Sequence, residues 1–392
     1  MEFPQYKERL VRPAAAKNHE FQDDGKLLHL INAAQLTPSL INQICELGDK
    51  IRLLSRQKKS ADQLRELLSH RRAMLYFTQP STRTFLSFMA ACQILGFTCN
   101  EVRDPKTSSE VKRESHTDAI RMFSSYFDVI IMRSQIANFA ESCSYLMNDL
   151  RAQQRRWVPI INAGSGSHEH PTQALLDVYT LKRSFRFLDR QGSDDRFQDL
   201  QKRHPGLQKG LSHKTYTFNG DIGRGRTVRS LATVLSQYDN VTMHFISPDD
   251  TVLRLDSQLE KSLESAGVNV YQHHSLDADH QGKSVLSQTD CLYMTRIQRE
   301  HNSHDDDDRF KKINLSDFQL TPQRAAQLKE YSPILHPFPR DSHVGEIPEQ
   351  IDLDPRAMYF RQARNGVWAR AALLAHVFDV TNDLQAIWES HQ

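Results

Sequence analysis

The segment MLYFTQPSTRTFLSFMAACQILG, residues 74–96, contains in order an apolar run, a short polar turn and a pattern with the apolar spacing of a helix. The run predicts a buried strand and the pattern a buried helix, so Ser81–Thr84 falls at the helix N-terminus. Unpaired backbone N–H groups and the helix dipole attract anions there, and the hydroxyls and Arg83 add donors. We therefore expect a phosphate site; the alternative is that Ser81 or Thr82 merely caps the helix.

Similar alternation continues along the chain and predicts an α/β fold with mostly parallel sheets flanked by helices. Because 392 residues exceed what one core usually organises, we expect two domains. The expected strands start at residues 73, 129, 158, 215, 241, 268 and 291. The expected helices are Thr37–Ser55, the stretch after Pro80, Glu114–Tyr126, Pro171–Ser184, Thr227–Ser236, Ser257–Ala266 and Asn365–Phe378. Two polar stretches, after residues 186 and 299, are expected to be long surface loops.

Composition narrows the class of protein. With 50 Lys and Arg against 48 Asp and Glu, the net charge is +2, which gives no reason to expect nucleic acid or a membrane as partner. The five cysteines are scattered without C-x-x-C spacing, so neither a disulfide framework nor a zinc site is indicated. The N-terminus lacks an apolar signal-peptide core, and a cytoplasmic protein is expected. The acidic run at 301–308 is expected to be solvated rather than to bind a metal.

Polar residues also follow other expected strands. Arg133 ends one apolar run, and His170 and Gln173 lie three residues apart in the first turn of an expected helix, with Pro171 between them. His336 and Pro337 follow another apolar run. Ligands of parallel α/β sheets collect at the carboxyl ends of strands, so these groups are candidates for one site. Taken alone, His170 could equally be a packed histidine.

Several of these stretches together resemble the aspartate/ornithine carbamoyltransferase family. The matching motifs are PSTRT (80–84), HPTQALLDVYTL (170–181), GDIGRGRTVRSL (220–231), YMTRIQRE (293–300), LHPFPR (335–340) and YFRQARNGVWARAALLA (359–375). The resemblance implies a carbamoyl phosphate domain at 26–169, completed by 357–392, and an aspartate domain at 170–356, after an N-terminal extension at 1–25. It also implies a homotrimer with active sites shared between chains.

The implied reaction transfers the carbamoyl group of carbamoyl phosphate to the amine of L-aspartate, a step of pyrimidine synthesis. By resemblance, Ser81, Thr82, Arg83, Thr84 and Arg133 hold the phosphate, while Thr84, Arg133 and His170 meet the carbamoyl oxygen and Gln173 the nitrogen. Fixed donors aimed at that oxygen stabilise the negative charge that builds there, so no nucleophilic side chain, metal or cofactor is required.

A loop of an adjacent chain completes the site in the family. The segment DPKTSSEVKRES, residues 104–115, matches it, with Ser108 and Lys112 in the positions of the family's serine and lysine. The family usually has a glycine after that lysine, whereas Arg113 stands here, so Lys106 and Arg113 remain alternatives to Lys112. The other interpretation is a solvated basic loop.

Aspartate needs cations for two carboxylates, and the planar fork of arginine suits them. Arg226, Arg296 and Gln298 match the family's aspartate-binding residues, and the backbone of Pro337 and Phe338 is expected to line the substrate sites. An ornithine enzyme would be expected to have cysteine in place of Pro337. The alternative for GDIGRG is a dinucleotide turn, but its glycines do not follow the G-x-G-x-x-G order.

The chain departs from the family at several positions. Gln79 replaces a glutamate, Phe338 replaces a leucine, and Phe85 and Met89 replace an arginine and a glutamate, which suggests an apolar pair in place of an ion pair. These departures bear on closure and kinetics more than on reaction type. The alternative functions are a transcarbamylase for a different amine and a non-catalytic assembly partner.

Overall fold

The computed structural model describes residues 3–103, 115–164, 166, 169–189, 192–297, 313–341 and 345–392. The chain forms two compact units: Met1–Tyr179 with Arg364–Gln392, and Thr180–Ala363. The sequence placed the boundary between residues 169 and 170, so His170 and Gln173, expected in the second domain, instead belong to the first unit. Within the described ranges, no helix combines the length and apolarity that crossing a membrane demands.

The first unit contains a four-stranded sheet in which every neighbouring pair is parallel. Its strands, in spatial order, are β4 (Thr98–Val102), β3 (Arg72–Phe77), β5 (Val129–Arg133) and β6 (Ile160–Asn162). The central strands are continuous apolar runs because helices cover both faces of a parallel sheet. The strands expected at residues 73, 129 and 158 are confirmed, whereas β4 was not anticipated.

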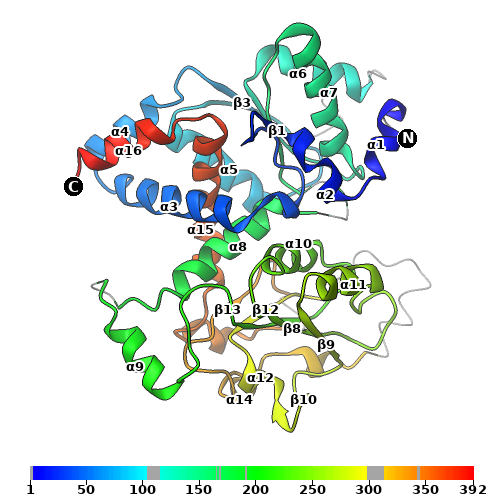
Figure 1. The fold of residues 1–392 in the computed structure, drawn as a ribbon, viewed down its shortest axis with the longest axis vertical. Coiled ribbons are helices and arrows are strands. Elements are labelled where there is room, and N and C mark those ends of the chain that lie inside the picture. The colour runs from blue at the N-terminus through cyan, green and yellow to red at the C-terminus, as the bar shows by residue number, and fades with distance from the viewer. Residues whose placement is uncertain are drawn as a thin grey trace. The chain divides into compact units, whose positions relative to one another are not determined.

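Helices surround this sheet, and α16 lies alongside α3 and α4 (Figure 1). The helices that lie in the first unit are α1 (Lys7–Leu10), α2 (Ala14–Lys17), α3 (Pro38–Leu54), α4 (Lys58–Glu66), α5 (Thr82–Leu95), α6 (His116–Tyr126), α7 (Phe139–Gln154) and α16 (Thr381–Glu389). Two further helices, α8 (Pro171–Ser184) and α15 (Tyr359–Val377), begin in one unit and end in the other. Short 3₁₀ turns of the chain occupy Pro4–Tyr6, Asn18–Phe21, Ala33–Gln35, Leu315–Phe318 and Glu349–Leu353.

The N-terminal segment expected as an extension packs into the first unit. Phe3, Tyr6 and Phe21 are buried in the same apolar cluster as Phe139 and Tyr145. The Tyr6 hydroxyl also donates a 2.6 Å hydrogen bond to Asp149. A short antiparallel hairpin, β1 (Gln22–Asp23) and β2 (Lys26–Leu27), follows. This segment therefore contributes to the core instead of standing apart from it.

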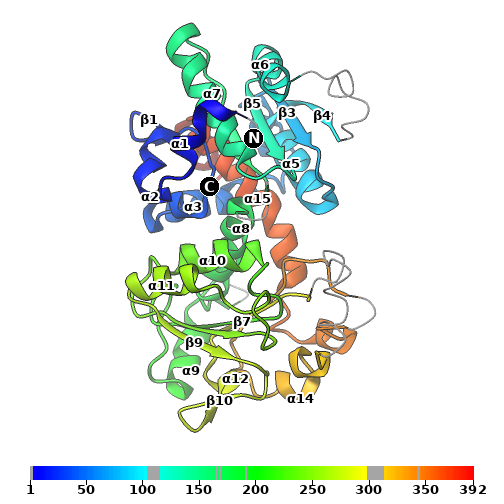
Figure 2. The same cartoon turned by 90° about the vertical axis from the view of Figure 1, so that its right-hand side faces the viewer.

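The second unit contains a five-stranded parallel sheet. Its strands, in spatial order, are β13 (Ile334–Leu335), β12 (Cys291–Met294), β7 (Thr215–Asn219), β8 (Thr242–Ile246) and β9 (Asn269–His273). Helices α10 (Arg226–Leu235) and α11 (Ser257–Ser265) lie on one face, and α12 (Val285–Gln288) and α14 (Pro322–Ala325) on the other (Figures 1 and 2). A hairpin of β10 (Asp279–His280) and β11 (Lys283–Ser284) precedes α12. The expected parallel α/β class is confirmed in both units.

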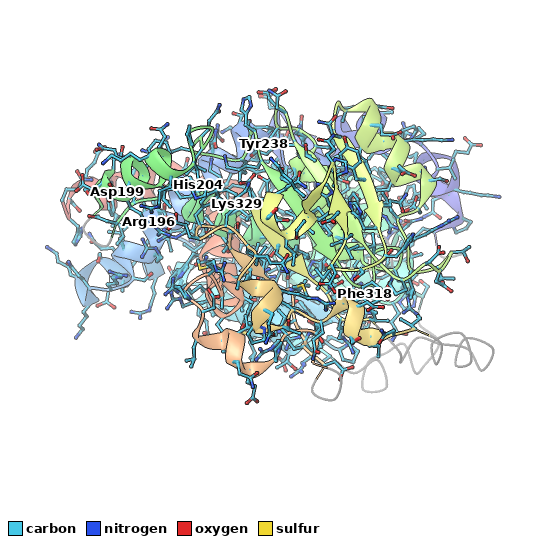
Figure 3. All side chains as sticks on the ribbon, turned by 90° about the horizontal axis from the view of Figure 1, so that it is seen from below. Arg196, Asp199, His204, Tyr238, Phe318 and Lys329 are labelled. Carbon is cyan, nitrogen blue, oxygen red and sulfur yellow. The ribbon has the colours of Figure 1, made fainter. Side chains whose placement is uncertain are left out.

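The polar stretch after residue 186 was expected to be a long surface loop. It contains helix α9 (Asp195–Arg203), so that expectation is wrong in part. Arg203 on this helix pairs with Glu330 at 2.7 Å, and the His204 ring meets the Tyr331 ring at 5.0 Å between centroids. His204 and Lys329, both labelled in Figure 3, line the same pocket of the second unit. The helix is therefore held on the second unit by contacts that a pattern of apolar spacing does not display. The other polar stretch lies mostly outside the described residues.

Candidate active site

The turn between β3 and α5 carries the hydroxyl residues that the sequence singled out. Ser81 is the N-cap residue of α5, with an extended backbone (φ −164°, ψ 99°). Within the described part of the chain, its side chain makes no capping hydrogen bond to the first turn. Thr82 and Arg83 are exposed and Thr84 is buried. The capping interpretation is therefore wrong for Ser81, whose hydroxyl does not compete with an anion for the first turn of the helix.

Arg133 lies next to this turn because β5 pairs with β3. Phe77, the last residue of β3, is the register partner of Arg133, and the Gln79 N–H donates a 3.2 Å hydrogen bond to the Arg133 carbonyl. The Arg133 side chain is only 9% exposed, and its Nη1 donates to the Ala163 carbonyl at 3.3 Å. Two chain segments that are distant in sequence thus bring a guanidinium to the anion-binding turn.

Gly164 allows Arg133 and His170 to converge. A Cβ atom at this position would lie 2.6 Å from Arg133 Nη1 and 3.0 Å from His170 Cδ2. The backbone is also left-handed there, with φ 102°, which L side chains rarely adopt. Gly164 was not singled out from the sequence, and the only signal was its place directly after an apolar run. Glycine is therefore needed both for the turn and for the approach of the two side chains.

His170 and Gln173 are fixed by the first turn of α8. The N–H groups of Gln173 and Ala174 donate to the His170 carbonyl at 3.0 and 3.2 Å. The Gln173 side chain is buried, and its Nε2 donates a 2.8 Å hydrogen bond to Oδ1 of Asp177. Asp177 is fully buried and was not anticipated as part of the site, although it lies one helical turn after Gln173.

The glycines of GDIGRG in the second unit serve backbone packing. A Cβ at Gly220, where φ is 116°, would lie 2.1 Å from the Thr295 carbonyl oxygen, and a Cβ at Gly223 would lie 2.0 Å from that of Val252. Asp221 pairs with Arg224 at 2.6 Å and is fully buried. These contacts explain the glycines without a pyrophosphate ligand, so the dinucleotide interpretation has no support.

Arg226 and Arg296 follow two neighbouring strands of the second sheet. Arg226 is the first residue of α10, after β7, and burial lowers the pKa of its guanidinium. Arg296 follows β12, which pairs directly with β7. The chain runs from β7 towards β9 in one direction and then returns to β12 on the other side, so both arginines flank the switch point of the sheet.

Pro337 and Phe338 follow the third of these strands, β13. His336 before them is buried; its Nε2 contacts Glu346 at 2.8 Å and its Nδ1 accepts from the Phe338 N–H at 2.8 Å. The Phe338 ring packs near Tyr359 and Phe360, with centroids 5.9 and 5.5 Å apart. The extra bulk relative to leucine is thus accommodated among aromatic rings.

Three expected site residues, Ser108, Lys112 and Gln298, lie outside the described residues. The acidic run at 301–308 does too. Phe85 is one of the positions where the chain departs from the family, and its ring is buried. The ring meets Phe77 edge-on, with centroids 5.4 Å apart, and the Cζ of Arg103 lies 4.6 Å from its centroid. This position is therefore a stable apolar contact.

The fold and these clusters define a protein of two parallel α/β units, each with cationic side chains at the carboxyl ends of its strands. Comparison with known families assigns the first part: the carbamoyl-P binding domain of aspartate/ornithine carbamoyltransferases matches residues 28–183. Their Asp/Orn binding domain matches residues 212–377. The chain belongs to the aspartate/ornithine carbamoyltransferase family.

Individual relatives agree with this assignment. The chain is 33% identical over 341 residues to the aspartate carbamoyltransferase catalytic subunit of Parabacteroides distasonis, covering 86% of this chain and 96% of the relative. It is 34% identical to the chloroplastic aspartate carbamoyltransferase of Oryza sativa, covering 89% and 84%. The aspartate transcarbamoylase of Trypanosoma cruzi, solved with carbamoyl phosphate and aspartate, superposes with a TM-score of 0.72 at 29% identity, covering 89% and 96%.

Proposed function

We propose that this protein transfers the carbamoyl group of carbamoyl phosphate to the amine of L-aspartate, giving N-carbamoyl-L-aspartate and phosphate in pyrimidine synthesis. The observation that carries the proposal is the convergence of Arg133 and His170 over Gly164. It lies at the carboxyl ends of β5 and β6, beside the N-terminus of α5. Membership of the family and the names of its aspartate-specific relatives support the same substrates.

The first unit can bind and polarise carbamoyl phosphate. The hydroxyls of Ser81, Thr82 and Thr84 and the N-terminus of α5 hold the phosphate, with Arg83 and Arg133 as counter-charges. His170, Arg133 and Thr84 donate to the carbamoyl oxygen. Donors fixed in advance stabilise the oxyanion that forms there more than they stabilise the substrate, which lowers the barrier.

The chemical step needs no covalent intermediate on the protein. The aspartate amine attacks the carbamoyl carbon, and negative charge moves onto the carbamoyl oxygen. The tetrahedral intermediate collapses by breaking the bond between that carbon and the phosphate oxygen. The leaving phosphate takes the amine proton, so the protein supplies binding, orientation and electrostatics.

Charge selects the amine. L-Aspartate has two carboxylates, and Arg226 and Arg296 are the cations of the second unit that match them by family position. The side chain of ornithine ends in an ammonium, which these guanidinium groups would repel. Pro337, where an ornithine enzyme would be expected to have cysteine, favours the same choice.

Assembly and location form part of the proposal. We propose a homotrimer in which Ser108 and Lys112 of one chain complete the site of the next, and a cytoplasmic location. The support is the match of residues 104–115 to the loop that the family uses for this purpose.

The test is product formation by the purified chain. Carbamoyl phosphate is supplied with L-aspartate or with L-ornithine, and N-carbamoyl product and phosphate are measured. We expect product from aspartate alone. Arg83→Gln should abolish most of the activity, whereas Arg65→Gln, which changes an exposed arginine of α4, should not. Product from ornithine alone would assign another amine, and phosphate release without product in all cases would contradict a transferase.

A further inference from the structure

A buried acid fixes the amide orientation of Gln173. The Nε2 of Gln173 donates to Asp177 at 2.8 Å, and a carboxylate offers only acceptors. The amide group therefore presents its Nε2 side to Asp177, which leaves Oε1 as the atom that can accept a hydrogen bond from a ligand. Asp177 is fully buried and Gln173 is 8% exposed, so water does not replace the hydrogen bond between them.

Arg370 on α15 supplies the positive charge near Asp177. The guanidinium is buried, and burial lowers its pKa to about 9, an effect that the Asp177 charge partly offsets. Its Cζ lies 4.8 Å from the centre of the Phe88 ring on α5. A Cβ at Gly366 would approach Arg370 Nη1 to 2.7 Å, so glycine leaves space for the guanidinium beside its own helix.

The same guanidinium is tied to the anion-binding turn. Nη1 of Arg370 donates a hydrogen bond to Oγ of Ser87. The hydroxyl of Ser87 donates to two backbone carbonyls of the turn. Its Oγ lies 2.7 Å from the Arg83 carbonyl oxygen and 3.1 Å from that of Thr84, so the proton is shared between them. Hydrogen bonds thus link the backbone of the phosphate-binding turn to Arg370 through Ser87, and a separate hydrogen bond links Asp177 to Gln173.

We propose that Asp177 and Arg370 are positioning residues that set the spacing and polarity of the two ends of the carbamoyl phosphate site. Arg370 holds the phosphate-binding turn through Ser87, and Asp177 makes Gln173 an acceptor for an N–H of the carbamoyl group. This inference rests on the proposed function. It adds a specificity element, because it assigns recognition of the carbamoyl N–H to the amide orientation that Asp177 imposes.

A ligand without N–H groups distinguishes the contribution of the carbamoyl end of the site from that of the phosphate end. Acetyl phosphate has a methyl group where carbamoyl phosphate has its amine, so it keeps the phosphate contacts and loses the donor to Gln173. In Asp177→Asn, the new amide can face Gln173 with either its oxygen or its N–H, whereas the wild-type carboxylate only accepts. Gln173 then loses its single fixed orientation, and where it presents Nε2 to the ligand it opposes the carbamoyl N–H.

The experiment is calorimetric titration of the full chain with carbamoyl phosphate, acetyl phosphate and inorganic phosphate. We expect the wild type to bind carbamoyl phosphate about tenfold more tightly than acetyl phosphate, the value of one buried hydrogen bond. Asp177→Asn should reduce this preference while affinity for inorganic phosphate stays unchanged. Ser87→Ala is the matched control for the other end: it should weaken all three ligands by roughly fivefold and keep the preference.

Arg370→Lys keeps the positive charge but loses the guanidinium that reaches Ser87, so it should behave like Ser87→Ala. If Asp177→Asn does not fold, the Asp177→Asn, Arg370→Gln double variant removes both charges and should also reduce the preference. A folded variant at Asp177 that retains the wild-type preference overturns the proposal, as does a wild type without any preference. A wild type that binds none of the three ligands overturns the proposed function as well.

Discussion

Phe77 and Arg133 are register partners at the carboxyl ends of β3 and β5. From β3 the chain continues to β4 on one side of the sheet, and from β5 it continues to β6 on the other. The pair therefore marks the switch point of the first sheet, where crossover connections diverge and leave space for a ligand. The phosphate-binding turn follows one partner and the polarising guanidinium belongs to the other.

Gly164→Ala should reduce both activity and stability. The added Cβ would lie 2.6 Å from Arg133 Nη1, so Arg133 and His170 must move apart. The alanine would also have to adopt φ 102°, a backbone conformation that L residues rarely take. We expect a loss of at least about tenfold in kcat/KM, since an oxyanion donor is displaced. Steady-state kinetics and thermal unfolding measure the two effects.

The control for Gly164→Ala is Gly25→Ala in the β1–β2 hairpin. Gly25 has φ 77°, and nothing lies within 4 Å of its Cβ position. This variant should lose about 1 kcal/mol of stability from backbone strain alone and keep its kinetics. Equal kinetics for Gly164→Ala and Gly25→Ala would show that Arg133 and His170 tolerate displacement.

Arg296→Ala should weaken aspartate far more than carbamoyl phosphate. The change removes a charge-assisted hydrogen bond to a carboxylate, worth roughly 2 kcal/mol, which corresponds to a rise of about thirtyfold in the KM for aspartate. Initial rates with each substrate varied in turn measure this. Arg254→Ala, at an exposed arginine of the same unit, is the control and should change neither KM. Equal weakening of both substrates contradicts the assignment.

Much of the fold followed from apolar runs, and the exceptions have physical causes. β4 was missed because it lies at the edge of its sheet, where most side chains of Thr98–Val102 face solvent and no apolar run forms. β13 is only two residues long. Helix α9 is strongly charged and buries only Leu200 among its own residues, so its sequence resembles a loop.

Site residues were predictable from the sequence where the residue type and its motif indicate the chemistry. They were less predictable where their role depends on which side chains the tertiary structure brings together. Arg133 and His170 were found from their motifs, yet the close approach that makes Gly164 necessary joins the ends of different strands. Asp177 and Arg370 were overlooked because a buried acid on one helix and a buried arginine on another acquire meaning only when the helices pack. The domain boundary was placed too early because α8 crosses from one unit to the other.

Hybrids of two inactive variants should recover activity if sites are shared between chains. Lys112→Ala and Arg83→Ala chains are each expected to be inactive alone. Mixed trimers contain some sites that combine an intact Arg83 from one chain with an intact Lys112 from its neighbour. We expect partial activity after the two variants are dissociated together and reassembled, measured by carbamoyl aspartate formation. Mixed trimers that form without activity would assign Lys112 to its own chain or to no catalytic role.

Acid should destabilise the first unit through His29. The ring is fully buried; its Nδ1 accepts the Ile160 N–H at 2.8 Å, which requires the tautomer in which Nε2 donates to Asn148 at 3.2 Å. Burial lowers the pKa of His29 to about 3. Protonation would remove the acceptor that holds the start of β6, so the folded state resists it.

The sign follows from the two pKa values. The folded value lies below the unfolded value of about 6.5, so above that pH both states are neutral and the full stability is present. As the pH falls from about 6.5 towards 3, the unfolded state takes up the proton first, and this histidine lowers the free energy of unfolding by up to about 1.4 kcal/mol per pH unit.

The expected result is a urea midpoint for the first unit that falls with acidification between pH 6.5 and 4.5. All three tryptophans, at positions 157, 368 and 388, belong to that unit, so their fluorescence reports its unfolding. His29→Gln has an amide that cannot titrate; it should be less stable at pH 7.5 but show a shallower dependence on pH. His70→Gln, at an exposed histidine, should retain the wild-type slope. If His29→Gln retains that slope too, the acid sensitivity arises from other groups and the buried His29 ring does not control it.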